Sequence, residues 1–137
     1  MTTIKLSHKQ TDDNSLFQII SDIQRGLSYV NFKNIAQKTA FTLSDWSSYL
    51  HLSERSLQRY EKENKSFDPL QSQQIVRIAM LYNRGEDVFG SLEKFNKWMS
   101  WESIALGGIK PKQLLDTTFG IEMIEDELTR IEHGVLA

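Results

Sequence analysis

Polar side chains suited to reading DNA occur together in one short segment near the middle of the 137-residue chain. An arginine side chain can bind guanine through two hydrogen bonds, and a glutamine side chain can bind adenine in the same way. Hydroxyl and lysine groups can reach bases or phosphates when a helix enters the major groove. The segment after Leu52 offers these groups at helical spacing. We predict that it contacts DNA through Ser53, Arg55, Ser56, Gln58, Arg59 and Lys62.

The charge around this segment predicts how many copies bind DNA. Residues 41–100 contain eight basic and eight acidic side chains, and Glu54, Glu61 and Glu63 offset the bases of the segment. Phosphate contacts supply much of the affinity for DNA, so one copy alone should bind weakly. We therefore predict a homodimer and an operator with an inverted repeat, its half-sites about one helical turn or a multiple apart. The alternatives are a helical hairpin that only builds the core and a degenerate module that no longer binds DNA.

Other chemistry is not predicted. The three histidines, at positions 8, 51 and 133, lack metal-ligand spacing, and the chain has no cysteine. The run Gly107-Gly108-Ile109-Lys110 lacks the spacing of a phosphate-binding loop, so Lys110 and Lys112 are expected to be solvated. No nucleophile, base and orienting group occur together. We predict no catalytic residue, no metal, no cofactor and no enzymatic activity.

Helices must position the predicted DNA-reading segment. Apolar residues recur at helical spacing almost everywhere and strict two-residue alternation is absent, so we predict an all-α protein. Ser53 can cap a helix over residues 54–63, and His51 is expected in the turn before it, as a cap or a phosphate contact. Together with a preceding helix this forms a helix-turn-helix pattern. That preceding helix is capped by Thr42 or Ser44 and carries Leu43, Trp46 and Leu50.

Three further helices are predicted around this pattern. The first two span residues 12–26 and 30–39, and a long one runs from Asp68 or Pro69 to Arg84-Gly85. The buried face of the long helix is expected to be lined or flanked by Leu70. The buried face of the first helix is expected to comprise Leu16, Ile19, Ile20 and Ile23.

The last third of the chain shows a separate set of landmarks. Ser91 can cap a helix with an apolar stripe, Gly107-Gly108 permits a sharp reversal, and Pro111 suits the first turn of a short helix. Gly120 is expected to allow a positive φ or a close approach between helices. A final helix ends at Gly134, with an apolar face of Ile121, Ile124, Leu128 and Ile131 and solvated acids at Glu122, Glu125, Asp126, Glu127 and Glu132.

These landmarks resemble a known domain. The order Phe-Gly, Trp-bearing helix, Leu-Gly-Gly, Pro, Leu-Leu, Gly and Leu-Thr-Arg-Ile-Glu-His-Gly over residues 89–134 resembles the toxin-binding domain of Xre/MbcA/ParS-type antitoxins. Residues 52–59 resemble the recognition-helix region of Xre-type regulators, a module that the same family usually joins to that domain. The two resemblances together extend over about residues 40–137.

The resemblance implies a type II antitoxin and an organisation in three parts. Residues 1–39 would form N-terminal helices with dimerisation as one role, residues 40–86 the helix-turn-helix module, and residues 87–137 a small helical toxin-binding domain. In this family the toxin is commonly a RES-domain protein that consumes NAD or transfers ADP-ribose from it, and the C-terminal end lies over its active site. The matching candidates for toxin binding are Arg130, Glu132, Gly134, Val135, Leu136 and Ala137.

Charge and hydropathy agree with such partners. Residues 101–137 hold three basic against seven acidic side chains, which favours a basic protein surface as partner, a solvated helix face being the alternative. The residues before Leu27 lack the apolar run of a signal peptide, and no apolar stretch approaches 18 residues. A cytoplasmic protein without a membrane span is expected. Two other functions stay open: a free-standing transcription regulator with a C-terminal dimerisation domain, and an uncharacterised enzyme.

Overall fold

The computed structural model describes residues 13–134, and over this range the chain is all-α, as predicted. Two 3₁₀ turns separate the last two helices: η1 (Ile104–Leu106) and η2 (Pro111–Leu114). The helices are α1 (Asp13–Arg25), α2 (Tyr29–Ala36), α3 (Leu43–Leu50), α4 (Glu54–Glu63), α5 (Pro69–Phe89), α6 (Leu92–Met99) and α7 (Thr118–Glu132).

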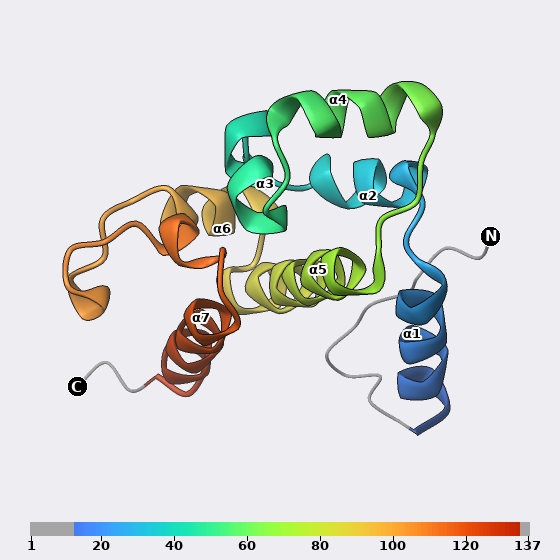
Figure 1. Ribbon diagram of the computed structural model, residues 1–137. Coiled ribbons are helices and arrows are strands. Elements are labelled where there is room, and N and C mark those ends of the chain that lie inside the picture. The colour runs from blue at the N-terminus through green and yellow to red at the C-terminus, as the bar shows by residue number, and fades with distance from the viewer. Residues whose placement is uncertain (1–12, 135–137) are drawn as a thin grey trace.

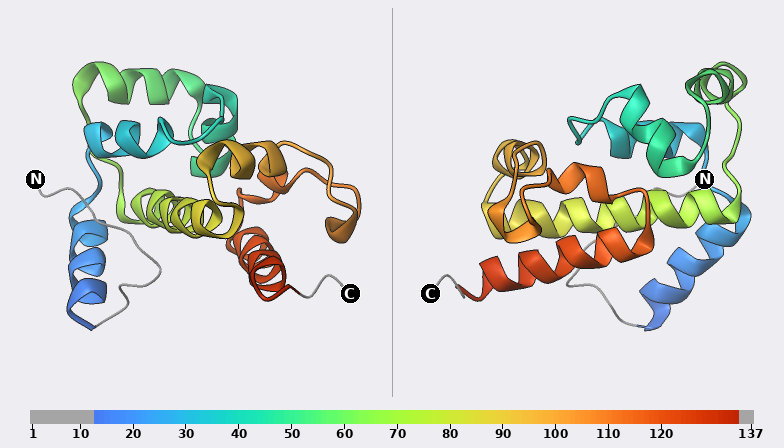
Figure 2. Two further views of the ribbon diagram at one scale, coloured as in Figure 1. Left: turned by 180° about the vertical axis from the view of Figure 1, so that it is seen from behind. Right: turned by 60° about the vertical axis from the view of Figure 1, so that its left-hand side comes forward.

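Helix α5 is the centre of the molecule. It has 21 residues, a length of about 30 Å at the usual rise per residue. Helices α2, α3 and α4 lie on one side of it, and α1 and α7 lie on the other, at its two ends (Figure 1). Helix α6 folds back along α5, and the loop between α6 and α7 extends from the same end of the molecule as α7 (Figure 2). Helices α1, α2, α3, α6 and α7 all pack directly on α5.

One continuous core joins both halves of the chain. A series of aromatic contacts runs from Phe32 on α2 through Trp46, Phe41 and Tyr82 to Phe95 on α6, with ring centroids 4.8–5.6 Å apart. Such edge-to-face pairs add to the stabilisation from area burial. The two halves are also bonded at Asn96 of α6, which accepts from Tyr82 Oη and from the backbone of residue 40 and donates to the carbonyl of residue 38.

The predicted starts of α3, α4, α5 and α6 are confirmed, and each has a side-chain cap. Thr42 and Asp68 form reciprocal capping boxes. Ser53 and Ser91 each accept a hydrogen bond from the backbone N–H three residues further on, at residues 56 and 94. These bonds satisfy backbone N–H groups that have no partner within the helix. The local sequence is therefore sufficient to start these helices.

The predicted end of the long helix at Gly85 is wrong. Helix α5 continues to Phe89 and ends at Gly90, which adopts φ 88°. Gly85 is buried inside the helix, where an added Cβ would lie 2.4 Å from the ring of Phe95. The glycine is therefore there to admit an aromatic ring and not to stop the helix.

Three expectations about burial are also wrong. Leu16 and Ile20 of α1 are exposed, and only Ile19 and Ile23 pack against the core, so α1 touches α5 along a narrow stripe. Leu70, in the first turn of α5, is 79% exposed.

Among residues 13–134 no helix is both long enough and apolar enough to span a membrane.

Candidate functional site

Helices α3 and α4 form the predicted helix-turn-helix pair. The turn between them is His51-Leu52-Ser53, and His51 ends α3 in the left-handed conformation with φ 55°. Ser47 on α3 donates a hydrogen bond to the carbonyl of Leu52, which ties the turn to the helix before it. Two buried side chains, Leu57 and Tyr60, hold α4 against the core.

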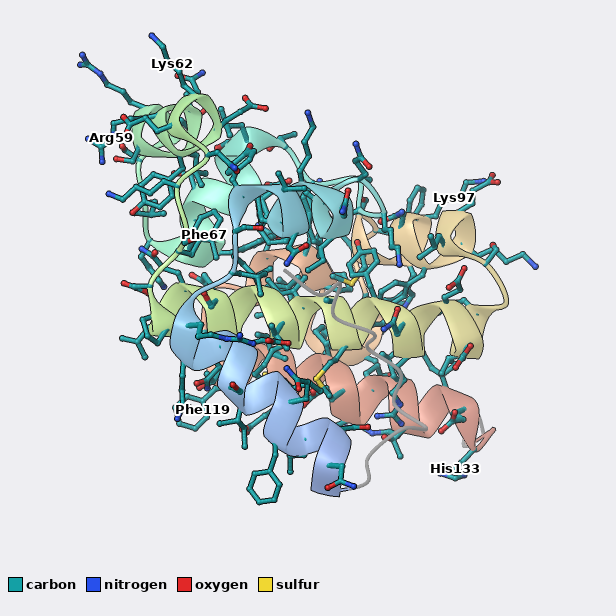
Figure 3. All side chains as sticks on the ribbon, turned by 90° about the vertical axis from the view of Figure 1, so that its right-hand side faces the viewer. Arg59, Lys62, Phe67, Lys97, Phe119 and His133 are labelled. Atoms are coloured by element: carbon teal, nitrogen blue, oxygen red, sulfur yellow. The ribbon has the colours of Figure 1, made fainter. Side chains whose placement is uncertain are left out.

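The cations of α4 point away from the protein. Successive residues of an α-helix are rotated by about 100°, so with Leu57 and Tyr60 inward, Arg55 and Lys62 lie directly opposite. The other two predicted readers, Gln58 and Arg59, lie on either side of that line and are exposed. Figure 3 shows Arg59 and Lys62 projecting outward from α4.

The acids of α4 lie on its flanks. By the same rotation, Glu54 and Glu61 fall on one side of the outward face and Glu63 on the other. Glu61 is engaged by Lys33 of α2 at 3.8 Å. The outward face is therefore basic, although the helix as a whole carries as many acids as bases. The acids that offset the basic side chains in the sequence therefore lie beside the outward face and not on it.

The two serines predicted to contact DNA, Ser53 and Ser56, are hydrogen-bonded to each other at the start of α4. Ser53 Oγ accepts the backbone N–H of Ser56 at 3.0 Å and donates to Ser56 Oγ at 2.9 Å. The Ser53 hydroxyl thus caps α4 and also bonds the hydroxyl of Ser56, which is half-buried. Within the described part of the chain, no hydrogen bond or ion pair engages the side chains of Arg55, Gln58 or Lys62.

The C-terminal helix α7 is fixed by an arginine of α5. Arg84 donates to Thr129 Oγ1 at 2.6 Å and to the carbonyl of Glu125, and it pairs with Glu132 at 3.5 Å. Two turns earlier on α5, Arg77 pairs with Glu125 at 3.1 Å. Glu132, a predicted toxin contact, therefore also has a partner inside the protein.

The expectation of a solvated acidic face on α7 is only partly right. Glu122 and Asp126 are exposed. Glu125 is half-buried in its pair with Arg77, and Glu127 is buried beside the aliphatic face of the helix, paired with the exposed Arg130 at 3.2 Å. The acids of α7 are thus used mainly to pack the helix.

The end of α7 matches its prediction as far as it is described. The helix is followed by Gly134 at φ 65°, and Arg130 and Gly134 are exposed. The other three predicted toxin contacts, Val135, Leu136 and Ala137, lie outside the described residues.

At the start of α7, Gly120 permits a close approach to the preceding segment, because an added Cβ would lie 1.7 Å from the carbonyl oxygen of Leu114.

The helix-turn-helix pair is bonded to the segment around η2. Tyr49 of α3 donates to the carbonyl of Lys112 at 2.7 Å, and Lys112 pairs with Asp45 at 3.6 Å. His51 Nε2 lies 3.0 Å from the carbonyl of Asp116, so the ring N–H donates across the junction. Burial, and secondarily the charge of Asp45, raises the pKa of Tyr49 well above its ordinary value.

These contacts correct one expectation. Lys112 is three-quarters buried and ion-paired rather than solvated. His51 is the C-cap of α3, one of the two roles expected of it, and its ring contacts the carbonyl of Asp116. A hollow of about 370 Å³ opens beside this junction between the start of α5 and the start of α7. Within residues 13–134 no group of three or more metal-ligating side chains occurs.

The fold and these surfaces define a helix-turn-helix protein with a second, C-terminal helical module. Family models agree with both modules. The antitoxin Xre-like helix-turn-helix domain matches residues 18–80, and the antitoxin Xre/MbcA/ParS C-terminal toxin-binding domain matches residues 84–134. The chain belongs to the Xre/MbcA/ParS antitoxin family, as its landmarks indicated.

Two curated relatives of this chain are both named Antitoxin Xre. The Antitoxin Xre of Yersinia enterocolitica is 34% identical over 84 residues, which are 61% of this chain and 57% of that protein, less than two thirds of its length. The Antitoxin Xre of Photorhabdus laumondii is 27% identical over 116 residues, which are 84% of this chain and 78% of that protein.

A solved structure shares the fold. A chain in the crystal structure of the M. tuberculosis MbcT–MbcA toxin–antitoxin complex superposes with a TM-score of 0.59 at 16% identity. The match covers 77% of this chain and 94% of that one. At this identity the likeness concerns the fold alone.

Proposed function

We propose that the chain neutralises a cognate toxin through its C-terminal module and represses its own operon through α4. The observation that carries the proposal is the joining of two features in one packed body. One is the outward basic face of α4, and the other is a toxin-binding domain matched over residues 84–134. A free-standing regulator would have no need of the second feature.

The toxin of this proposal is a RES-domain protein that consumes NAD or transfers ADP-ribose from it. The family resemblance supports this choice. In the proposed complex, the end of α7 faces the toxin's active site through Arg130, Glu132 and residues 134–137. When the toxin binds, Glu132 can exchange its pair with Arg84 for a cation of the toxin, because Arg84 remains bonded to Thr129 and to the carbonyl of Glu125.

The DNA-bound form is proposed to be a homodimer. Exposed apolar side chains on α1 support this part of the proposal: Leu16, Phe17 and Ile20 are 52%, 68% and 39% exposed on one helix. A two-fold axis that joins two such stripes buries them and presents two copies of α4. Each α4 then enters a major groove, and the pair reads an inverted repeat.

The test is co-expression with the product of the neighbouring gene, followed by pull-down and a growth assay. The full chain should restore growth and bind its own promoter. Deletion of residues 134–137 should abolish protection, or restrict it to a large excess of antitoxin, while promoter binding stays intact. Full protection by the deleted chain, with unchanged toxin affinity, would remove the tail from the proposal. A full chain that binds the promoter but no neighbouring gene product would favour a free-standing regulator.

A further inference from the structure

The loop between α6 and η2 exposes apolar side chains that the protein does not use. Trp101 is 77% exposed, Ile104 is 96% exposed and Ile109 is 42% exposed. Helix α6 buries Phe95 and Met99 completely, so the loop begins directly after a well-packed segment. Water contact with an indole and an isoleucine side chain is unfavourable, and a rigid apolar projection of this kind is typical of a binding surface.

The loop is ordered by its own backbone. The N–H of Ser103 donates to the carbonyl of Ile109 at 3.0 Å, and the N–H of Gly108 donates back to the carbonyl of Ser103 at 2.7 Å. Gly107 and Gly108 adopt φ of 76° and 83°, which reverses the chain at no steric cost. Leu106 packs against the core and holds the loop down. The exposed side chains are therefore presented in a fixed position, which lowers the entropy cost of binding.

The surroundings of Trp101 fit a protein partner. A hollow of about 330 Å³ lies beside its indole ring and is bounded by Ser100, Glu102 and Lys110. An aromatic anchor with a charged rim of both signs is the usual composition of a protein-binding hot spot. The position also fits the C-terminal module, since the whole loop lies within the matched residues 84–134.

Two copies of the chain are a poor explanation for this surface. Helix α1, which carries the exposed apolar stripe, lies at the opposite end of the molecule from η1 (Figure 1). One closed dimer uses one self-complementary patch, and α1 supplies it in the proposed dimer. The loop lies instead on the side of the molecule where α7 ends, in both views of Figure 2. A toxin bound at the end of α7 would therefore lie on the same side of the molecule as this loop.

We propose that the loop of residues 101–109 is a second anchor for the toxin, with Trp101 and Ile104 inserted into an apolar depression on its surface. This inference rests on the proposed function and adds to it. The tail at the end of α7 blocks the active site, while the loop supplies most of the apolar contact. The two sites together hold the toxin at two points, so the short tail alone need not provide the affinity.

The experiment compares Trp101→Ala/Ile104→Ser with the wild-type chain, using the purified, catalytically inactivated product of the neighbouring gene. Toxin affinity, measured by calorimetry, should fall at least about 30-fold, the size expected for losing a hot-spot aromatic residue. The melting temperature and the promoter affinity should not change, because both side chains lie outside the core. The matched control is Phe119→Ala, an aromatic residue equally exposed at 78% at the opposite end of α7 from His133 (Figure 3). It should bind the toxin like the wild type.

Each other outcome overturns the inference. Unchanged toxin affinity in the double variant and in Ile104→Ser alone removes the loop from the interface but leaves the proposed function standing. A wild-type chain that fails to bind the gene product overturns both. Light scattering that shows a smaller assembly for the double variant, with toxin affinity unchanged, assigns the loop to contacts between copies. An equal loss in Phe119→Ala shows that general surface apolarity, and not the loop, determines binding.

Discussion

Helices α4 and α7 each carry six charged side chains but use them in opposite ways. On α7, three carboxylates pair with arginines, two of which come from α5. On α4, one exposed pair joins Glu61 to Lys33 at 3.8 Å, and the cations point to solvent. A count of charges therefore does not separate a helix that packs from a helix that binds. The direction of each side chain relative to the core does.

This difference predicts where substitutions act. Helix α7 contacts α5 and the η2 segment closely, so changes on its inner face should reduce the stability of the whole protein. Helix α4 is held mainly by Leu57 and Tyr60. Changes on its outer face should leave stability unchanged and alter only DNA binding. The following predictions test this contrast, from the largest expected effect to the smallest.

Gly120→Ala should destabilise the protein most. The new methyl group would meet the carbonyl oxygen of Leu114, which belongs to the backbone and cannot rotate away. Overpacking of this kind should lower the free energy of unfolding by roughly 3 kcal/mol, measured by urea denaturation. Gly107→Ala is the control, since its site is open and only its positive φ is strained. A smaller effect at Gly120 than at Gly107 would mean that α7 packs loosely, contrary to the comparison.

Arg59→Ala should weaken binding to the protein's own promoter without lowering stability. A bidentate contact with guanine contributes about 1–3 kcal/mol of discrimination, so specificity at one base pair should relax. Toxin neutralisation should survive. Anisotropy titrations with operator and scrambled DNA measure both effects. If Arg59→Ala, Arg55→Ala and Gln58→Ala all leave promoter affinity unchanged, the outer face of α4 does not read DNA.

Tyr49→Phe should have an intermediate effect at the junction between the two modules. It removes the hydrogen bond to the carbonyl of Lys112, at a cost of about 1 kcal/mol. Because burial raises the pKa of Tyr49 in the folded state, its contribution is fully present below pH 10 and is lost as the pH rises above that value. The unfolding free energy of the wild type should therefore fall above pH 10, and that of Tyr49→Phe should fall less steeply. Equal slopes would contradict this assignment.

Glu61→Gln should change stability least. The pair with Lys33 is long and both side chains are more than half exposed, so its loss should cost under about 0.5 kcal/mol. Promoter affinity should rise slightly at low salt, because one negative charge leaves the flank of the basic face. Thermal melts and titrations at two salt concentrations measure the two effects. A fall in promoter affinity would show that the flank acids orient α4 instead of opposing it.

Local features of the sequence predicted the helices well and their partners poorly. Ser53 and the span of α4 were correct because a capping side chain acts within three residues. Gly85 was misinterpreted because its reason, the ring of Phe95, comes from the next helix. The pairs that occupy Glu125 and Glu132 join residues 48 positions apart, a distance at which no periodic pattern carries information.

The candidate site was predictable to different depths. The residue types of α4 were enough to select Arg55, Gln58, Arg59 and Lys62, and the fold adds that all four share an outward face. Their contact with DNA stays a prediction. The exposed Trp101 had no signal in the sequence, because it lies outside any helical stripe and its exposure depends on how the loop folds back. Such surfaces emerge only when the packing of their neighbours is known.

The central position of α5 limits how the two halves of the chain can be exchanged between related proteins. The two matched family regions end at residue 80 and begin at residue 84, and the boundary predicted at residue 86 is close by; all three points fall inside this one helix. No cut there leaves either half with an intact core. A chimaera that combines the operator specificity of one antitoxin with the toxin specificity of another must therefore exchange surface residues around a whole α5. Recombination within residues 69–89 would therefore select for halves whose core residues match across α5.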